Sequence, residues 1–281
     1  MRRRSTVWTV LSVAAVGLSA CQASSAASKS AASATTSTAA PTTTTVAPTT
    51  TVAPTTTTVA PTTTTRPPVA TTLPRPTTTV PAGPPVLQVG SNGAAVLQLQ
   101  QSLTALGYWL GTPNGSFGQT TQQAVWALQK AAGIPRTGTD NAATAAALAA
   151  GTKPTAMSTS GHVIEVNLAK DLVLFVDNGV VTTILNTSTG GHYVFYLDGR
   201  RQVAITPTGH FTTIREVNGT DISPLGTLWR PKFFVGGFAI HGDSYVPAVP
   251  VSHGCVRVTD AAMNWVWSSG VDPIGTPVWV Y

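Results

Sequence analysis

The chain has 281 residues, of which only 9% are charged, and its formal net charge at pH 7 is +6. Part of that charge comes from the arginines at positions 2–4, and no basic cluster follows them, so the composition gives no support for nucleic-acid binding. A chain of this length has room for one or two folded domains.

The N-terminal residues have the pattern of an export signal. The arginines precede an apolar run from Val7 to Leu18, which is too short to span a bilayer permanently, and Ser19-Ala20-Cys21 follow. The sequence Leu-Ser-Ala-Cys closely resembles the bacterial lipobox, in which the cysteine is diacylated and becomes the mature N-terminus. We therefore expect residues 1–21 to be a lipoprotein signal peptide, with Cys21 as the lipid attachment site. An unmodified cysteine in an ordinary signal peptide is the alternative.

Residues 22–85 consist almost entirely of Ala, Ser, Thr, Pro and Val, with a loose repeat of the form Thr-Thr-Thr-Thr-Val-Ala-Pro. This segment has no large apolar or aromatic set whose burial would offset the entropy lost on ordering. We expect an extended, partly polyproline-II linker that joins a membrane anchor to the domains that follow.

From residue 86 the composition becomes globular, and helical spacing of apolar residues predicts a three-helix bundle over residues 86–151. The first helix is predicted from Ala94 to Leu106, and the second from about Thr120 to Gly133. The third is predicted from Asn141 to Ala150, with Asp140 as its N-terminal cap. The segment contains neither histidine nor cysteine, so we expect no catalytic site in it.

This segment resembles the peptidoglycan-binding type-1 domain. The residues that carry the resemblance are Leu99-Gln100, Leu106-Gly107-Tyr108, Gly115-Ser116-Phe117-Gly118, Ala124-Val125, Leu128-Gln129, Gly133 and Gly138. The resemblance implies docking on the cell wall. A spacer bundle that binds nothing is the alternative, because a fold does not guarantee a ligand.

From Gly161 the pattern changes to strands, and we expect residues 161–281 to form a mainly β domain, a sandwich or open barrel. His162–Val166 alternates apolar and polar residues with period two, and Asp177-Asn178-Gly179 is a strong hairpin turn. The other predicted strands are Leu172–Val176, Val180–Leu185, Val203–Ile205, Phe211–Ile214, Phe238–Ile240 and Thr276–Val280.

One helix is predicted near the C-terminus. Thr259 is placed to cap it, Gly270 to end it, and Met263, Val266 and Trp267 form an apolar stripe along it. We expect this stripe to pack against one side of the β domain.

The most informative stretch is Ser252-His253-Gly254-Cys255-Val256-Arg257, with His241 a short way upstream. A thiol flanked by histidine and arginine is the arrangement expected of a thiolate nucleophile, because both positive charges lower the pKa of the sulfur. The glycine allows a tight turn, so that the sulfur and adjacent N–H groups can point at one reacting carbonyl. The alternative is an inert buried cysteine.

Other uses of this cysteine fit the sequence less well. All five histidines precede Cys255, which excludes a papain-like order with its histidine downstream. His241, His253 and Cys255 could supply three zinc ligands, but their spacing is unlike that of common zinc motifs. We therefore expect neither a metal site nor a cofactor. The remaining histidines are expected to be surface or structural residues: His162, His192 and His210.

Residues 161–281 closely resemble the L,D-transpeptidase (YkuD-like) catalytic domain. The resemblance is carried by Ser188-Thr189-Gly190, Thr206-Pro207-Thr208-Gly209, Ile240-His241-Gly242 and Ser252–Arg257. It implies an enzyme that acts outside the cytoplasm on peptidoglycan stem peptides in the cell wall. It further implies that 3→3 cross-links form through a covalent thioester.

The resemblance also assigns roles to individual residues. Cys255 would be the nucleophile, His241 the general base and acid, and His253 a third catalytic residue near the oxyanion. Arg257 would hold a substrate carboxylate or raise the local potential. The residues implied at the oxyanion and substrate-binding site are Ser252, Gly254, Arg257 and Gly242.

Two other functions remain open. An L,D-carboxypeptidase would share the acylation step but use water to release the product, and a non-catalytic wall-binding lipoprotein would have a decayed site. If the chain is a transpeptidase, we expect deletion of residues 86–150 to weaken retention on the wall while leaving turnover of soluble stem peptides largely intact.

Overall fold

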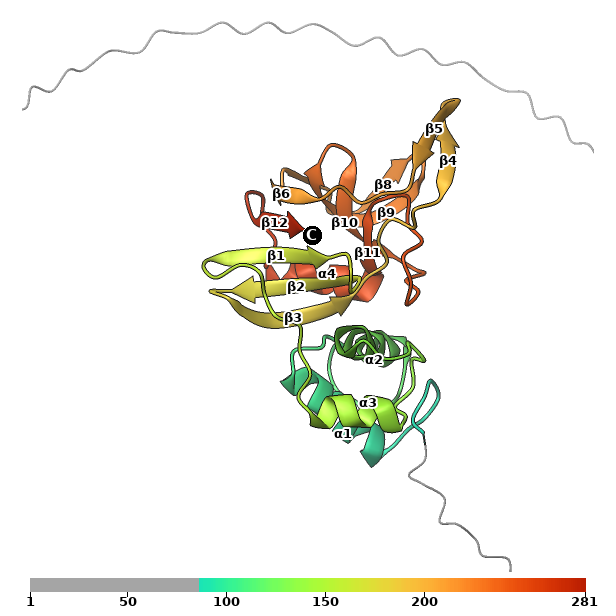
Figure 1. Cartoon of the computed structure of the whole chain (residues 1–281), viewed down its shortest axis with the longest axis vertical. Coiled ribbons are helices and arrows are strands. Elements are labelled where there is room, and N and C mark those ends of the chain that lie inside the picture. The colour runs from blue at the N-terminus through green and yellow to red at the C-terminus, as the bar shows by residue number, and fades with distance from the viewer. Residues whose placement is uncertain (1–85) are drawn as a thin grey trace, which may run out of the picture. The chain divides into compact units, whose positions relative to one another are not determined.

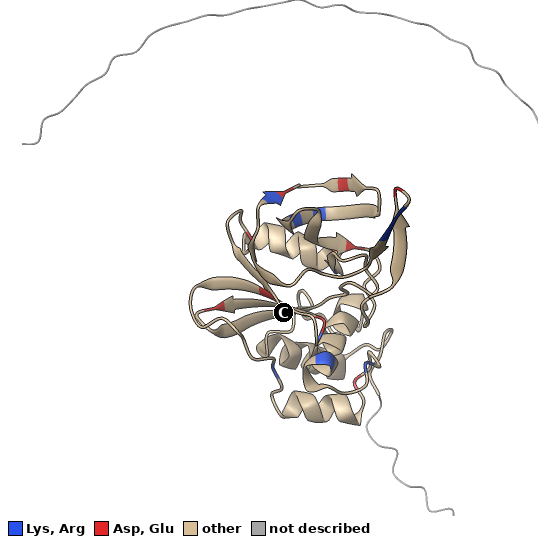
Figure 2. Ribbon diagram, turned by 45° about the horizontal axis from the view of Figure 1, so that its top comes forward, with Lys and Arg blue, Asp and Glu red and all other residues tan. Residues whose placement is uncertain are grey.

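The computed structural model describes residues 86–281. The predicted signal peptide, Cys21 and the linker lie outside the described residues. Within residues 86–281, no helix is both long enough and apolar enough to cross a membrane. Lys, Arg, Asp and Glu residues are sparse and dispersed along this part of the chain (Figure 2).

The first part of the described chain is a three-helix bundle, as predicted (Figure 1). It consists of α1 (Ala94–Ala105), α2 (Gln119–Ala132) and α3 (Ala142–Ala149). The cap of the third helix was predicted one residue too early. Asn141, not Asp140, is the N-cap, and its side chain accepts a hydrogen bond from the Thr144 N–H at 3.0 Å.

The remainder is a mainly β domain built on two larger sheets and a hairpin. Across the first sheet the order is β3 (Val180–Asn186), β2 (Leu172–Asp177), β1 (His162–Asn167), β12 (Pro277–Val280) and β6 (Gly209–Thr212). Across the second it is β11 (Val256–Thr259), β10 (Phe238–Asp243), β9 (Gly226–Val235) and β7 (Arg215–Glu216), with β8 (Thr220–Ser223) also paired to β9. The separate hairpin is formed by β4 (Val194–Leu197) and β5 (Arg200–Val203).

The two larger sheets share one apolar core with the C-terminal helix α4 (Asp260–Ser269). The Thr259 hydroxyl caps this helix by accepting from the Ala262 N–H at 3.2 Å, and Gly270 ends it in the left-handed conformation, both as predicted. Met263 and Val266 are buried in this core, whereas Trp267 is only partly buried.

Strand β2 is buried on both of its faces, which period-two reasoning did not predict. Val173 and Phe175 face the core between the sheets. Leu172, Leu174 and Val176 join a second core whose other members are mostly side chains of the helical bundle. The bundle lies on the side of β2 and β3 (Figure 1). The first sheet is therefore a middle layer, and its outer face completes the core of the bundle.

The alternation predicted for β1 also fails at Glu165, which is fully buried. Its carboxylate accepts hydrogen bonds from the Ser158 N–H and hydroxyl, both at 2.7 Å, and from the Tyr281 hydroxyl at 2.8 Å. A buried carboxylate needs such donors, and they come from segments that the local pattern of β1 does not contain.

The observed strands differ from the predicted ones in two further places. The strand predicted at Val203–Ile205 is β5, which ends at Val203. The ten-residue strand β9 was missed, because Arg230, Pro231 and Lys232 interrupt its apolar pattern. Lys232 is nevertheless buried there, where its ammonium group pairs with Glu216.

Candidate active site

Parallel strands β10 and β11 place the motif residues on one face. His241 and Arg257 are in register across the two strands, so their side chains project to the same side. Cys255 immediately precedes β11. A cavity of about 440 Å³ opens there, and its lining includes Ser252, His253, Cys255, His241 and Arg257.

Two of the predicted site residues do not line this cavity. A Cβ atom on Gly242 would lie 2.7 Å from Asp260 Oδ1 and 2.8 Å from Trp229 Cδ1, so the glycine allows β10 to pack closely against its neighbours. Gly254 shapes the turn before Cys255. Both are scaffold positions in this structure.

The turn that carries Cys255 is held from inside by a serine. Ser252 Oγ accepts from the Gly254 N–H at 3.0 Å and donates to the Cys255 carbonyl oxygen at 2.5 Å. Gly254 has a φ of 137°, and a Cβ there would lie 2.5 Å from the Phe238 ring. Ser252 thus occupies the Gly254 N–H in this structure, whereas the family resemblance implied that this group lies at the oxyanion.

The environment of Cys255 differs from the predicted one in a second respect. Burial raises the pKa of the Cys255 thiol above its ordinary value, whereas the Ala239 N–H and Arg257 lower it by less. The predicted net lowering of this pKa is therefore wrong for the free protein. The thiol is protonated at neutral pH, and an attack on a carbonyl needs a base to remove its proton.

His241 lines the same cavity as Cys255. It is 4% exposed, and its Nδ1 lies 2.8 Å from the Gly242 carbonyl oxygen. A carbonyl only accepts hydrogen bonds, so Nδ1 carries the proton and Nε2 keeps its lone pair. Burial is the main cause that lowers the pKa of His241, and Arg257 adds to it, against weaker effects of Gly242 and Asp243. The ring is therefore neutral at pH 7.

Arg257 has a partner that sequence reasoning did not identify. Its Nε lies 3.2 Å from Asp243 Oδ2, and both side chains are about one-fifth exposed. Asp243 follows the His241-Gly242 pair and is in register with Thr259 across β10 and β11. The carboxylate holds the guanidinium at the wall of the cavity, which both residues line.

His253 lies on the side of the cavity formed by the β4–β5 region. Its ring meets those of Phe195 and Tyr193 edge-on, with centroid distances of 4.7 and 5.5 Å. Burial, followed by the charge of Arg257, lowers the pKa of His253. These aromatic neighbours were not predicted, because they come from a hairpin far from the motif in sequence.

Two other histidines lie in structural positions, as expected. His162 is within 2.6 Å of Asp177 Oδ1 and within 2.7 Å of the Val271 carbonyl oxygen. His210 stacks on Trp279. Among residues 86–281, no group of three or more His, Cys, Asp or Glu side chains is arranged to hold a metal ion.

Comparisons with known proteins agree with this architecture. The YkuD model of the L,D-transpeptidase catalytic domain matches residues 161–280, and the PG_binding_1 model of a peptidoglycan binding domain matches residues 92–148. The crystal structure of the L,D-transpeptidase from Xylanimonas cellulosilytica DSM 15894 is 48% identical and has a TM-score of 0.69. It is matched over 72% of this chain and 100% of its own.

More distant structures also match. An L,D-transpeptidase (Yku) from Stackebrandtia nassauensis is 21% identical, with a TM-score of 0.41 over 69% of this chain and 94% of its own. One from Mycobacterium smegmatis is 18% identical, with a TM-score of 0.34 over 43% of this chain and 59% of its own. No curated protein matches the chain. The chain belongs to the L,D-transpeptidase family, with a YkuD catalytic domain preceded by a peptidoglycan-binding domain.

Proposed function

We propose that the chain is a peptidoglycan L,D-transpeptidase that forms 3→3 cross-links by acyl transfer, with Cys255 as nucleophile and His241 as general base and acid. The observation that carries the proposal is the cavity beside β10 and the start of β11. There both side chains line one cavity, and the Gly242 carbonyl leaves Nε2 of His241 free to accept a proton. Family membership supports the reaction class.

In the acylation step, His241 Nε2 takes the thiol proton as Cys255 Sγ attacks the carbonyl carbon of the third, L-configured stem residue. The bond between that carbon and the nitrogen of the terminal D-alanine then breaks. His241 returns the proton to the leaving amine, which departs as D-alanine, and the enzyme holds a thioester. Because thiol and imidazole both begin neutral, proton transfer accompanies the attack.

In the second step, the side-chain amine of a diamino acid on another stem attacks the thioester carbonyl. The amine loses a proton to His241, the carbon–sulfur bond breaks, and the sulfur takes the proton back. The product is a 3→3 cross-link. Water in place of the amine would give the carboxypeptidase reaction by the same path.

The oxyanion would be stabilised by the Cys255 N–H, with His253 beside it. Within the described residues 86–281, the Cys255 N–H makes no hydrogen bond, whereas the Gly254 N–H is bound by Ser252. Arg257 would hold a substrate carboxylate or raise the local potential; its ion pair with Asp243 leaves it at the cavity wall in either role.

The rest of the chain would bring this site to its substrate. We infer that residues 86–151 bind peptidoglycan, in line with the matched domain, and that residues 161–281 do the chemistry. Residues 1–21 would be a lipoprotein signal peptide, Cys21 the anchor at the outer face of the membrane, and residues 22–85 the linker that reaches the wall.

Intact-mass spectrometry tests the acyl transfer. The full chain carrying Cys21→Ser is incubated with a soluble tetrapeptide stem, with and without a stem that offers only an acceptor amine. We expect a tripeptidyl adduct on Cys255, absent from Cys255→Ala, and a cross-linked dimer when the acceptor is present. Release of tripeptide acid alone at saturating acceptor would instead identify a carboxypeptidase, and the lack of any adduct would identify a non-catalytic binding protein.

A further inference from the structure

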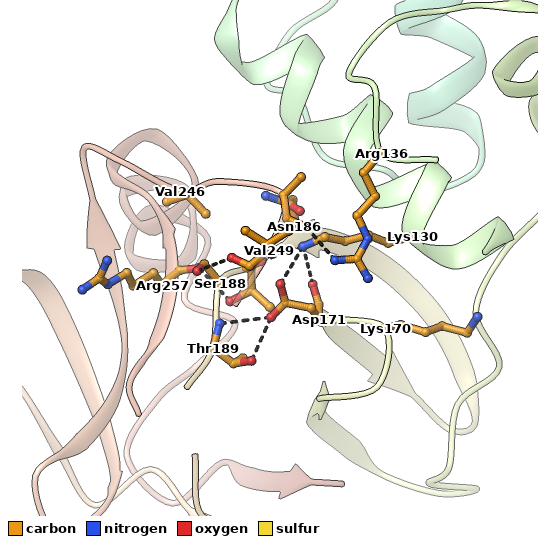
Figure 3. Close-up of polar contacts among 12 residues, drawn as sticks. Lys130, Arg136, Lys170, Asp171, Asn186, Ser188, Thr189, Val246, Val249 and Arg257 are labelled. Carbon is orange, nitrogen blue, oxygen red and sulfur yellow. Dashed lines mark hydrogen bonds and ion pairs between the residues drawn. The ribbon is translucent and has the colours of Figure 1, made fainter. Parts of the chain in front are cut away.

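A lysine of the helical bundle is fully buried against the β domain (Figure 3). Lys130, in α2, places its Nζ 2.9 Å from Asp171 Oδ2, 3.0 Å from the Asp171 carbonyl oxygen and 2.7 Å from the Thr187 carbonyl oxygen. Burial lowers the pKa of Lys130 to about 8, and Asp171 opposes that shift, so the ammonium group is charged at neutral pH. All three of its hydrogen atoms have acceptors in the β domain.

Asp171 links Lys130 to Thr189. Its Oδ1 accepts from the Thr189 N–H at 3.0 Å and from the Thr189 hydroxyl at 2.8 Å, while Oδ2 faces Lys130 (Figure 3). Asp171 has a φ of 56°, a left-handed conformation that aspartate adopts more readily than most residues. Lys130 and Thr189 bind the two oxygens of its carboxylate.

The segment from Thr187 to Thr189 in turn holds the nucleophile motif. Ser188 and Arg257 exchange two backbone hydrogen bonds, each at 3.1 Å, and the Ser252 N–H donates to the Thr189 carbonyl oxygen at 2.9 Å. The Thr187 hydroxyl donates to the Arg257 carbonyl oxygen at 2.7 Å. The residues that flank Cys255 on both sides are thus aligned on a segment that Lys130 fixes.

Helix α2 and the turn that follows it also contact the loop that joins His241 to this motif. The Gln123 side chain donates to the Val246 carbonyl oxygen at 2.8 Å, and Arg136 donates to the Ala248 carbonyl oxygen at 2.7 Å. The Ser188 hydroxyl donates to the Val249 carbonyl oxygen at 2.8 Å, which joins the loop to the same segment. The bundle therefore holds both connections of the catalytic turn.

We propose that Lys130 is a positioning residue for Cys255, and that the helical bundle supports the active site as well as docking on the wall. The proposal rests on the proposed function of Cys255. Lys130 does not touch substrate. It holds Thr187 and Asp171, and these two residues align Ser188 and Thr189. The segment from Thr187 to Thr189 then sets the register of the turn that presents the Cys255 thiol.

The test uses the full chain carrying Cys21→Ser, so that Cys255 is its one thiol. Lys130→Met removes the ammonium group. Lys170→Met is the matched control, because the Lys170 ammonium group also bridges the bundle and the β domain, through the Ala131 carbonyl oxygen at 2.9 Å, but does not reach the Thr187–Thr189 segment. The double variant Lys130→Met with Asp171→Asn removes both charges while keeping an acceptor for Thr189.

Four quantities are measured for each variant: Tm, kcat and KM on a soluble stem tetrapeptide, and the rate of Cys255 alkylation by iodoacetamide as a function of pH. We expect Lys130→Met to lower Tm and to lower kcat about tenfold to a hundredfold with KM changed by less than about threefold. The double variant should recover most of the Tm, because no unpaired charge stays buried. Its kcat should stay low, because the bonds to Thr187 and Asp171 carbonyls are still missing.

The outcomes separate positioning from mere stability. Recovery of both Tm and kcat in the double variant would show that Lys130 only neutralises a buried charge, and would overturn the proposal, as would wild-type kcat in Lys130→Met. The pH at which the alkylation rate is half-maximal should shift in Lys130→Met and in the double variant but not in Lys170→Met. This readout needs no substrate, so it still tests the positioning role if the wild type proves not to turn over stem peptides.

Discussion

Thr206 Oγ1 donates to the Gly254 carbonyl oxygen at 2.7 Å and accepts from the Gly190 N–H at 3.0 Å. One buried hydroxyl thus joins the turn before Cys255 to the segment that ends at Gly190. Ser252 holds the same turn from within. These neutral hydrogen bonds hold the turn directly, and the titrating side chains of the cavity take no part in them.

Replacing Thr206 by valine should loosen this turn at nearly constant volume. The buried Gly190 N–H and Gly254 carbonyl would each lose a partner, so we expect Thr206→Val to lower the free energy of unfolding by about 2–4 kcal/mol. Acylation of Cys255 should slow as well. The exposed Thr208, changed to valine, is the control. Equal urea midpoints and acylation rates for the two variants would contradict the role given to Thr206.

Variants of the two histidines should separate their roles. Cys255→Ala should abolish acylation. His241→Ala should cost more than His253→Ala, because loss of the proton acceptor disables both acylation and deacylation. Loss of an oxyanion contact costs about 3–4 kcal/mol, so His253→Ala should keep slow, measurable acylation in single-turnover mass spectrometry. If His253→Ala is the inactive variant and His241→Ala is not, the base has been assigned to the wrong residue.

The acylation rate should rise with pH on an acid limb set by His241. Burial lowers the pKa of His241, so its midpoint should fall below the ordinary value of 6.5. The ring must be neutral to accept the thiol proton, so the rate increases as pH rises through this pKa. The limb should be absent in His241→Ala and present in His253→Ala, as measured by acylation rates across the acid range. A limb that survives in His241→Ala would exclude His241 as its source.

Asp272 should make the protein less stable as pH rises. Burial raises its pKa to about 6, and Thr213 and Lys232 oppose that shift. A pKa raised in the folded state favours folding below the unfolded value of 3.8, and this contribution is lost as pH rises through 6. A rise of this size corresponds to about 3 kcal/mol. Relative to wild type, Asp272→Asn should therefore gain about that much between acid and neutral pH in urea unfolding. The exposed Asp198, changed to asparagine, should show no such trend.

Removal of the bundle should damage the β domain, in contrast to the expectation from sequence. Without residues 86–151, five apolar side chains on the outer face of the first sheet would meet water: Leu172, Leu174, Val176, Val181 and Ile184. Their exposure costs on the order of 10 kcal/mol, comparable to the whole stability of a domain. We expect residues 152–281 alone to aggregate or to lose cooperative melting. If the truncated chain melts like residues 86–281 and turns over soluble stem peptides, the bundle and the β domain are independent modules and this prediction is wrong.

Lipidation of Cys21 is tested on the protein in its host. Wild type should fractionate with membranes and carry a lipid mass on its N-terminal cysteine, whereas Cys21→Ser should not. Recovery of an unmodified, freely soluble wild type as the main species would exclude the anchor.

Most signals contained within a few residues of chain were read correctly from the sequence, although the cap of α3 was placed one residue too early. The Thr259 cap and the Gly270 end of α4, the turn at Asn178-Gly179 and the tight turn at Gly254 all depend on backbone preferences of neighbouring residues. The motif around Cys255 is equally local, and its resemblance to a known family is sufficient by itself to indicate the reaction class.

The tertiary structure decided what depends on burial and on distant partners. Lys130 has the spacing of an ordinary helix lysine, and only the packing of α2 on the β domain makes it a buried cation with an acidic partner. The same holds for Glu165, and for the direction in which the pKa of Cys255 moves. Sequence shows which charges lie near a thiol along the chain, whereas desolvation depends on how much of the molecule surrounds it, and here desolvation is the larger effect.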